Sequence, residues 1–208
     1  MIDWVPERFA YRRSPLQVAL LTFATLGLYF FVWAFWVRRW CAATLEREDQ
    51  PIWKTVALII PIFNFFLIFE LGKMIEGTLW RAQLPAARLS LPWIGLSAFF
   101  INALWKLPDP YGFLADLIFL PYAYLQFAFT RAQLALTGLG PTPLRWWEWV
   151  IAVLGFAAQI LAAIGISLPN DGVPVPNPWF GWAVLGFSTL MLIAIAHGSR
   201  AFPIEKRA

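Results

Sequence analysis

Long runs of apolar residues dominate the chain, and they do not alternate with polar residues at the spacing of an amphipathic helix or strand. Six blocks stand out, at residues 15–37, 55–71, 91–104, 112–129, 149–168 and 179–196. A membrane-spanning helix needs about 20 apolar residues, within a range of roughly 17–25. Five blocks meet that length, and block 91–104 could span only with help from polar or aromatic residues at its ends. The pattern predicts an all-α fold, a polytopic membrane bundle of about six helices in a single domain, residues 1–208.

The composition agrees with a membrane location. Of 208 residues, 60% are hydrophobic and 13% are charged, whereas soluble domains run roughly 45–50% apolar and about 25% charged. The net charge of +4 is scattered between apolar blocks, which favours cationic loops at a cytoplasmic lipid surface over nucleic-acid binding. The 13 tryptophans lie in or near block ends, which favours an aromatic belt at the headgroups over an aromatic ligand site.

The first block breaks at Thr25-Leu26-Gly27, which leaves two topologies open. Six full crossings with a cytoplasmic N-terminus put 11 of the 16 Lys and Arg residues inside and leave five outside, namely Arg38, Arg39, Arg47, Lys54 and Lys106. If the first and fourth blocks are re-entrant, 13 lie inside and three outside, namely Lys73, Arg81 and Arg88. However, a lipid-exposed bend leaves backbone groups unpaired at several kcal/mol each, while glycine in a continuous helix costs only about 1 kcal/mol. We therefore expect one kinked crossing, with both termini cytoplasmic.

The chain also resembles itself at a distance. Residues 28–46 are similar to residues 120–138, and a Pro-Trp-x-Gly sequence occurs at Pro92 and again at Pro178. These matches suggest a duplicated three-helix unit, residues 15–105 and 112–198. Repeats with an odd number of spans are inverted across the membrane, as in many secondary transporters.

Three short motifs resemble a known family. They are Thr-Leu-Gly-Leu-Tyr at residues 25–29 with Trp33, Pro-Ile-Phe-Asn at residues 61–64, and Tyr-Leu-Gln at residues 124–126. Together they are similar to small bacterial membrane proteins known only as a domain of unknown function, with TLGxYxxxW, PxxN and YLQ helices. The resemblance covers roughly residues 15–135, and it departs after Gln126, where the family has a charged residue and Leu-Asn. It implies a bacterial inner-membrane location and no assigned activity.

Polar side chains inside apolar blocks are costly and therefore mark candidate sites. Asn64 follows Pro61, which indicates hydrogen bonding between helices at a kink, or a substrate contact at a broken helix. Glu70 precedes Lys73 by three residues, which favours an ion pair over a proton-carrying site. The full candidate set of intramembrane polar residues is Asn64, Glu70, Asn102, Asp116 and Gln126.

Asp116 is the carboxylate with the strongest functional interpretation. It has no cation at helical spacing, so it is a hydrated or Lys106-paired acid near the outer surface, or a group that meets Asn64 at the midplane between inverted repeats. Asn102 and Gln159 are most simply explained by helix packing.

Catalytic signatures are not found. The chain has one histidine, His197, placed to interact with a helix C-terminus, and one cysteine, Cys41, whose pKa the nearby Arg38 and Arg39 could lower. Neither has a partner at motif spacing, so we expect no metal, no cofactor and no enzymatic activity. The first hypothesis is a non-enzymatic accessory or scaffold protein of the bacterial inner membrane, with lipid and possibly other membrane proteins as partners. The second is a small solute or ion transporter or channel with inverted three-helix repeats.

Overall fold

The computed structural model describes residues 11–84, 91–104, 114, 117–168 and 179–200, and these residues form helices and no strand. The predicted all-α fold is confirmed. The helices are α1 (Pro15–Ala24), α2 (Tyr29–Thr44), α3 (Pro51–Ala57), α4 (Pro61–Arg81), α5 (Leu91–Leu104), α6 (Phe119–Thr137), α7 (Trp146–Ser167) and α8 (Phe180–Ser199).

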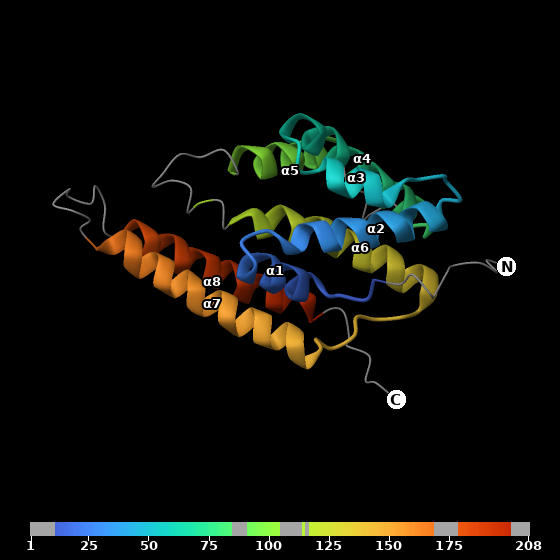
Figure 1. Ribbon diagram of the computed structural model, residues 1–208. Coiled ribbons are helices and arrows are strands. Elements are labelled where there is room, and N and C mark those ends of the chain that lie inside the picture. Colours follow the sequence, from blue (N-terminus) through green and yellow to red (C-terminus); the bar gives the residue numbers. More distant parts are fainter. Residues whose placement is uncertain (1–10, 85–90, 105–113, 115–116, 169–178, 201–208) are drawn as a thin grey trace.

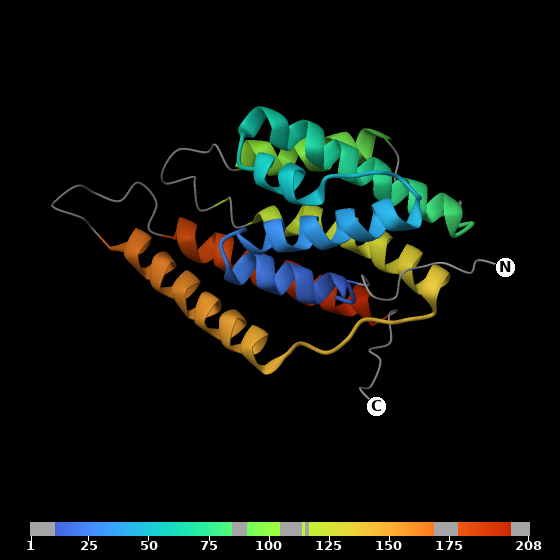
Figure 2. The same ribbon diagram turned by 45° about the vertical axis from the view of Figure 1, so that its right-hand side comes forward.

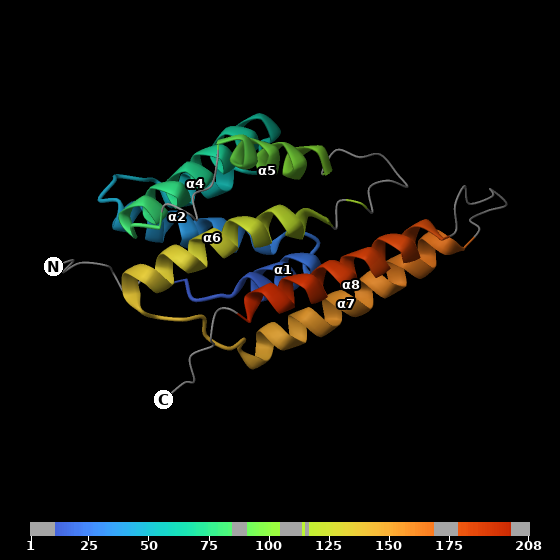
Figure 3. The ribbon, with the colours of Figure 1, turned by 180° about the vertical axis from the view of Figure 1, so that it is seen from behind.

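The helices pack in layers (Figure 1). Helices α3, α4 and α5 lie on one side of a central pair, α2 and α6, and helices α1, α7 and α8 lie on the other side. The views turned by 45° and 180° show the same order, with α7 and α8 reaching past the link between α1 and α2 at one end (Figures 2 and 3). Two core clusters correspond to this division, one centred on α2, α4 and α6 and one between α1, α6, α7 and α8.

The first apolar block does not make one kinked crossing, because the chain reverses within it. Helix α1 runs antiparallel to α6, since Gln126 donates to the Arg13 carbonyl while Phe23 packs on Phe119. Helix α2 runs parallel to α6, because Phe30 stacks on Tyr122 and Trp40 packs on Phe129 further along both helices. Helices α1 and α2 therefore form a hairpin, and the expected single crossing is wrong.

A bend in lipid was expected to leave costly unpaired backbone groups, and the reversal at residues 25–28 avoids unpaired N–H donors. Leu26 and Gly27 both have positive φ, at 52° and 85°, and glycine adopts this conformation without steric penalty. Every backbone N–H from Thr25 to Phe31 finds an acceptor within the turn, including Gly27 N to Thr22 O at 2.8 Å. The Thr25 hydroxyl donates to Leu21 O and accepts from Tyr29 N, both at 2.8 Å. No N–H donor of this bend is left unpaired, so it can face an apolar environment.

The second block, residues 55–71, is also divided. Helix α3 ends at Ala57, and α4 begins at Pro61. Proline suits the first position of a helix because the N–H that it lacks would have no intrahelical partner there. Pro61 therefore starts a helix and does not kink one, and the expected span across residues 55–71 is wrong.

The arrangement of α2 and α6 also bears on the predicted repeat. These two helices carry the matching segments, and they run in the same direction side by side. Inverted copies would place them in opposite directions. The inversion is therefore wrong for this pair, and the duplication itself is not confirmed.

Among the described residues, two helical windows are long and apolar enough to cross a membrane: Trp146–Gly165 in α7 and Phe180–Ser199 in α8. They correspond to the fifth and sixth predicted blocks. Only 22% and 28% of these windows is buried inside the protein, whereas the core helix of a soluble domain is mostly buried. The count of six spans is not confirmed.

Tryptophan has two roles in the structure. Trp53, Trp146 and Trp179 are largely exposed, as a belt residue would be. Trp33 and Trp40 are fully buried between α2 and α6, which the expectation of an aromatic belt missed.

Two glycines of α7 provide a matched test of packing. A Cβ on Gly155 would lie 2.1 Å from the Ala24 carbonyl oxygen, whereas one on Gly165 would meet nothing within 4 Å. We expect Gly155→Ala to lower the free energy of unfolding by about 1–3 kcal/mol, as overpacking does. Gly165→Ala is expected to leave it unchanged or raise it by up to about 1 kcal/mol, the helix-propensity difference. Thermal unfolding of both variants in detergent measures this, and equal midpoints would contradict the close approach of α1 to α7.

Candidate functional site

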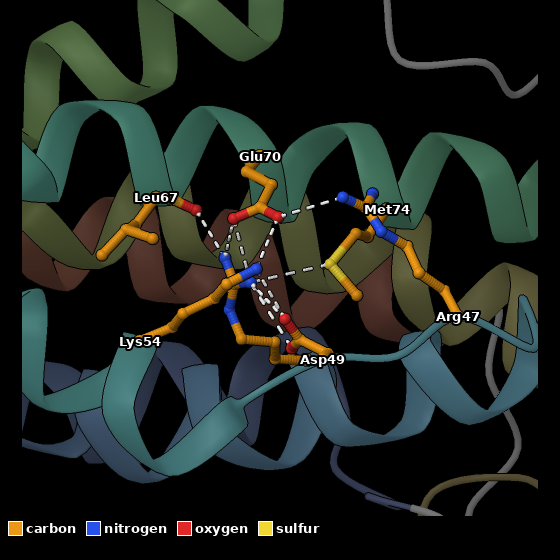
Figure 4. A network of polar contacts seen from close by, with 7 residues as sticks. Arg47, Asp49, Lys54, Leu67, Glu70 and Met74 are labelled. Carbon is orange, nitrogen blue, oxygen red and sulfur yellow. Dashed lines mark hydrogen bonds and ion pairs between the residues drawn. The ribbon is translucent and has the colours of Figure 1, made fainter.

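A network of ion pairs around the Arg38 side chain joins α2, α3 and α4. Figure 4 shows Asp49, Lys54 and Glu70 of this network close together. The guanidinium of Arg38 lies 3.0 Å from Glu70 Oε2 and 3.3 Å from Asp49 Oδ1, and it donates to the Leu67 carbonyl at 3.1 Å. The Arg38 and Asp49 side chains are only 1% and 2% exposed. A buried charge is stable only when it is paired and hydrogen-bonded, and this pairing explains how an arginine fits inside an apolar helix pair.

Two further cations complete the network. Lys54 Nζ lies 2.7 Å from Asp49 Oδ1 and 2.8 Å from Glu70 Oε1, and the half-exposed Arg47 reaches Glu70 Oε1 at 3.5 Å. Both acids are therefore shared between cations. Such a site is saturated with internal partners, and the chemistry it performs best is to hold three helices together.

The chain positions these groups by reversing after α2. Helix α2 ends at Thr44, the positive φ of Glu46 (52°) turns the chain, and Pro51 begins α3. This return places Asp49 and Lys54 beside α2 and α4, where Arg38 and Glu70 face each other. Arg38, Asp49 and Lys54 were not predicted as site residues; the available signal was an arginine directly after an apolar block, which requires a counter-ion if the helix continues.

The predicted partner of Glu70 is wrong. Lys73 pairs with Glu76 at 3.0 Å on the exposed face of α4, while Glu70 turns to α2 and α3. Spacing along one helix identifies residues on one face, but the nearest counter-charge here comes from other helices. The predicted ion pair of Glu70 exists, with different cations.

Gln126 and Asn64 have packing roles at separate places. Gln126 is fully buried, accepts from Trp33 Nε1 at 2.6 Å and donates to the Arg13 carbonyl and to Thr130. It thus joins α2, α6 and the start of α1. Asn64 Nδ2 donates to the Leu58 carbonyl at 2.8 Å and so closes the turn between α3 and α4.

The remaining candidates are not brought into this network. Asn102 lies in α5, and its side chain is outside the described part of the structure, as is Asp116 altogether. His197 lies in the last turn of α8, as predicted. Within the described ranges, no group of three or more His, Cys, Asp or Glu residues could hold a metal ion.

A second buried ion pair fixes the start of α1 to the start of α7. Arg13 Nη2 lies 2.6 Å from Glu148 Oε1, and Arg13 Nη1 also donates to the Thr142 hydroxyl at 2.8 Å. The other Glu148 oxygen accepts from the Arg145 backbone N–H at 2.6 Å. This contact was not predicted, because 135 residues separate the partners.

Cys41 is fully buried in α2 near this network. Burial raises the pKa of its thiol, and the lowering effect of Arg38 is smaller. The expectation of a lowered pKa for Cys41 is wrong, because desolvation of the thiolate outweighs the attraction of Arg38.

Comparison of the chain with family models, curated proteins and solved structures finds no match. The resemblance based on the TLGxYxxxW, PxxN and YLQ motifs stays a prediction.

Separate substitutions of the adjacent residues Arg38 and Arg39 in α2 test the contribution of the network to stability. Arg38→Gln leaves Asp49 and the Leu67 carbonyl without their buried donor, and we expect a loss of about 3 kcal/mol in unfolding free energy. Arg39 lies over the Trp36 ring at 5.8 Å, and Arg39→Gln is expected to cost about 0.5–1 kcal/mol.

Labelling of the buried Cys41 thiol measures the stability of this region. A thiol-reactive dye should label Cys41 only as α2 and α4 separate, so the labelling midpoint on heating reports this region. We expect a clearly lower midpoint for Arg38→Gln and a near-native one for Arg39→Gln. Similar midpoints in the two variants would show that Arg38 contributes no more than a surface arginine.

Proposed function

We propose that this chain is a multi-helix membrane protein, anchored by α7 and α8, that acts as a non-enzymatic accessory or scaffold protein. The proposal has two parts, the membrane location and the scaffold role, and different observations support them.

The distribution of charge is the main support for the proposed membrane location. All described Lys, Arg, Asp and Glu residues lie at the level of the Arg38–Glu70 contact or on the side of it away from the turns at residues 25–28 and 58–60. The other half of the bundle, including the second half of α7 and the first half of α8, has no described charge. Instead, it exposes large apolar side chains such as Leu161, Ile164 and Phe187. An uncharged apolar half suits hydrocarbon, and a charged half suits headgroups and water.

The excess of cations in the charged half supports an orientation in the membrane. Its described residues include eleven cations, Arg12, Arg13, Arg38, Arg39, Arg47, Lys54, Lys73, Arg81, Arg131, Arg145 and Arg200, against six acids, Glu46, Glu48, Asp49, Glu70, Glu76 and Glu148. Excess Lys and Arg favour the cytoplasmic side. We therefore place the starts of α1 and α7 and the end of α8 at the cytoplasmic face, and the family resemblance favours a bacterial inner membrane.

The use of the polar residues supports a scaffold. Asn64, Glu70 and Gln126 are engaged in contacts within and between helices, so they stabilise the bundle. The outward faces of α7 and α8 are apolar, which suits contact with lipid and with the helices of other membrane proteins.

Cysteine labelling tests location and sidedness together. In a Cys41→Ala background, single cysteines replace the exposed residues Glu48 and Leu168. We expect the protein to stay in the membrane pellet after alkaline extraction. A membrane-impermeant maleimide on spheroplasts should label the Leu168 position, and the Glu48 position only after permeabilisation. Release by alkali, or equal labelling of both positions in intact spheroplasts, would overturn the proposal.

The scaffold role has its own test. A photo-crosslinker at the lipid-facing position Leu161 should capture one defined membrane protein, whereas the same group at Glu48, on the charged side, should not. Solute flux through reconstituted vesicles above that of protein-free vesicles would instead establish the transporter hypothesis and overturn the scaffold.

A further inference from the structure

The reversal between α1 and α2 lies opposite the middle of α7. At the start of α1, Arg13 is paired with Glu148, near the beginning of α7. At its end, Ala24 lies against Gly155, and the Phe23 carbonyl accepts from Gln159 at 3.3 Å. Helix α7 runs from Trp146 to Ser167, so the turn reaches only about half of its length. If α7 spans the bilayer, the turn lies near the midplane.

The turn between α3 and α4 lies at the same depth. Arg38 is nine residues from the first residue of α2 (38 − 29 = 9), and Glu70 is nine residues from the first residue of α4 (70 − 61 = 9). Arg38 and Glu70 are in contact, and α2 and α4 run parallel. At 1.5 Å per residue, both turns are therefore about 13.5 Å from this ion pair. This is close to half of a hydrocarbon core of about 30 Å.

Both turns present aliphatic side chains to their surroundings. Leu26 and Leu28 are 63% and 64% exposed at the first turn, and Ile59 and Ile62 are 66% and 73% exposed at the second. In water, the exposed apolar surface of these tips would cost about 25 cal/mol of free energy per Å².

The paired N–H donors of residues 25–31 and 58–60 also suit hydrocarbon. The first turn has all its N–H donors paired, as described above. At the second, Leu58, Ile59 and Ile60 donate to the carbonyls of residues 55–57, and Asn64 caps Leu58.

We propose that α1–α2 and α3–α4 are re-entrant hairpins that enter the bilayer from the cationic side and turn at its midplane. This inference rests on the proposed membrane location of α7 and α8. In this arrangement, the two turns contact the ends of the lipid acyl chains. The Arg38–Asp49–Lys54–Glu70 network lies at the headgroup boundary of the same leaflet. These four helices thus displace lipid from one leaflet, whereas α7 and α8 displace it from both.

Depth measurements on spin-labelled protein test this geometry. In the Cys41→Ala background, labels replace the exposed tip residues Leu26 and Ile59 in separate variants. Three exposed positions of α7 serve as references: Leu154 near its middle, and Trp146 and Leu168 at its two ends. Collision with oxygen, which concentrates in hydrocarbon, is compared with collision with a water-soluble nickel complex in reconstituted vesicles.

The expected oxygen-to-nickel ratio at Leu26 and Ile59 equals that at Leu154 and exceeds that at Trp146 and Leu168. Ratios at the tips as low as those at Trp146 would overturn the inference while leaving α7 in the membrane. A Glu48 label accessible to an impermeant reductant from the Leu168 side would also overturn it, because α2 would then cross. A low ratio at Leu154 itself would instead show that the membrane location fails.

Discussion

A chain that bends in an apolar environment has to pair its own backbone N–H donors, and the link between α1 and α2 meets this requirement. The Thr25 hydroxyl serves both helices, and the positive φ of Leu26 and Gly27 lets the next donors reach back into α1. Because these N–H donors are paired within the chain, α2 can return along α6 and face α4. The stacking of Phe30 on Tyr122, the Trp33–Gln126 hydrogen bond and the Arg38 network all depend on this direction of α2.

The direction of α2 then determines where charge can be buried. Arg38 projects from an apolar helix toward α4, and the chain supplies Asp49 and Lys54 from the segment that follows α2. With one acid, Arg38 would form an isolated pair whose desolvation cost rivals its attraction. With two acids, two more cations and a backbone carbonyl, the hydrogen-bonding groups of the network are satisfied. The network is thus a consequence of the hairpin, and it fixes α3 and α4 beside α2.

Composition and block length were sufficient to predict an all-α protein and the positions of α7 and α8, since a long apolar run has few alternatives. The division of the first two blocks was harder to predict. Thr25 and Gly27 signalled a break, but the energy of a bend depends on hydrogen bonds that only coordinates reveal. Pro61 was interpreted as a kink when it begins a helix. Glu70 was predicted to be paired, but its partners come from residues 38, 47 and 54, whose proximity no local spacing indicates.

The close approach of Ala24 to Gly155 fixes the position of the α1–α2 hairpin along α7. A re-entrant loop held only by lipid would rise or sink with the thickness of the bilayer. Here, the turn is fixed to α7 at Gly155 and Gln159, and the start of α1 is fixed to the start of α7 through Arg13 and Glu148. Contacts at both ends of α1 therefore fix its position relative to α7, whatever surrounds the protein. In the proposed re-entrant arrangement, the volume that α1–α4 occupy in one leaflet would therefore be rigid, and the lipid would have to adjust to it.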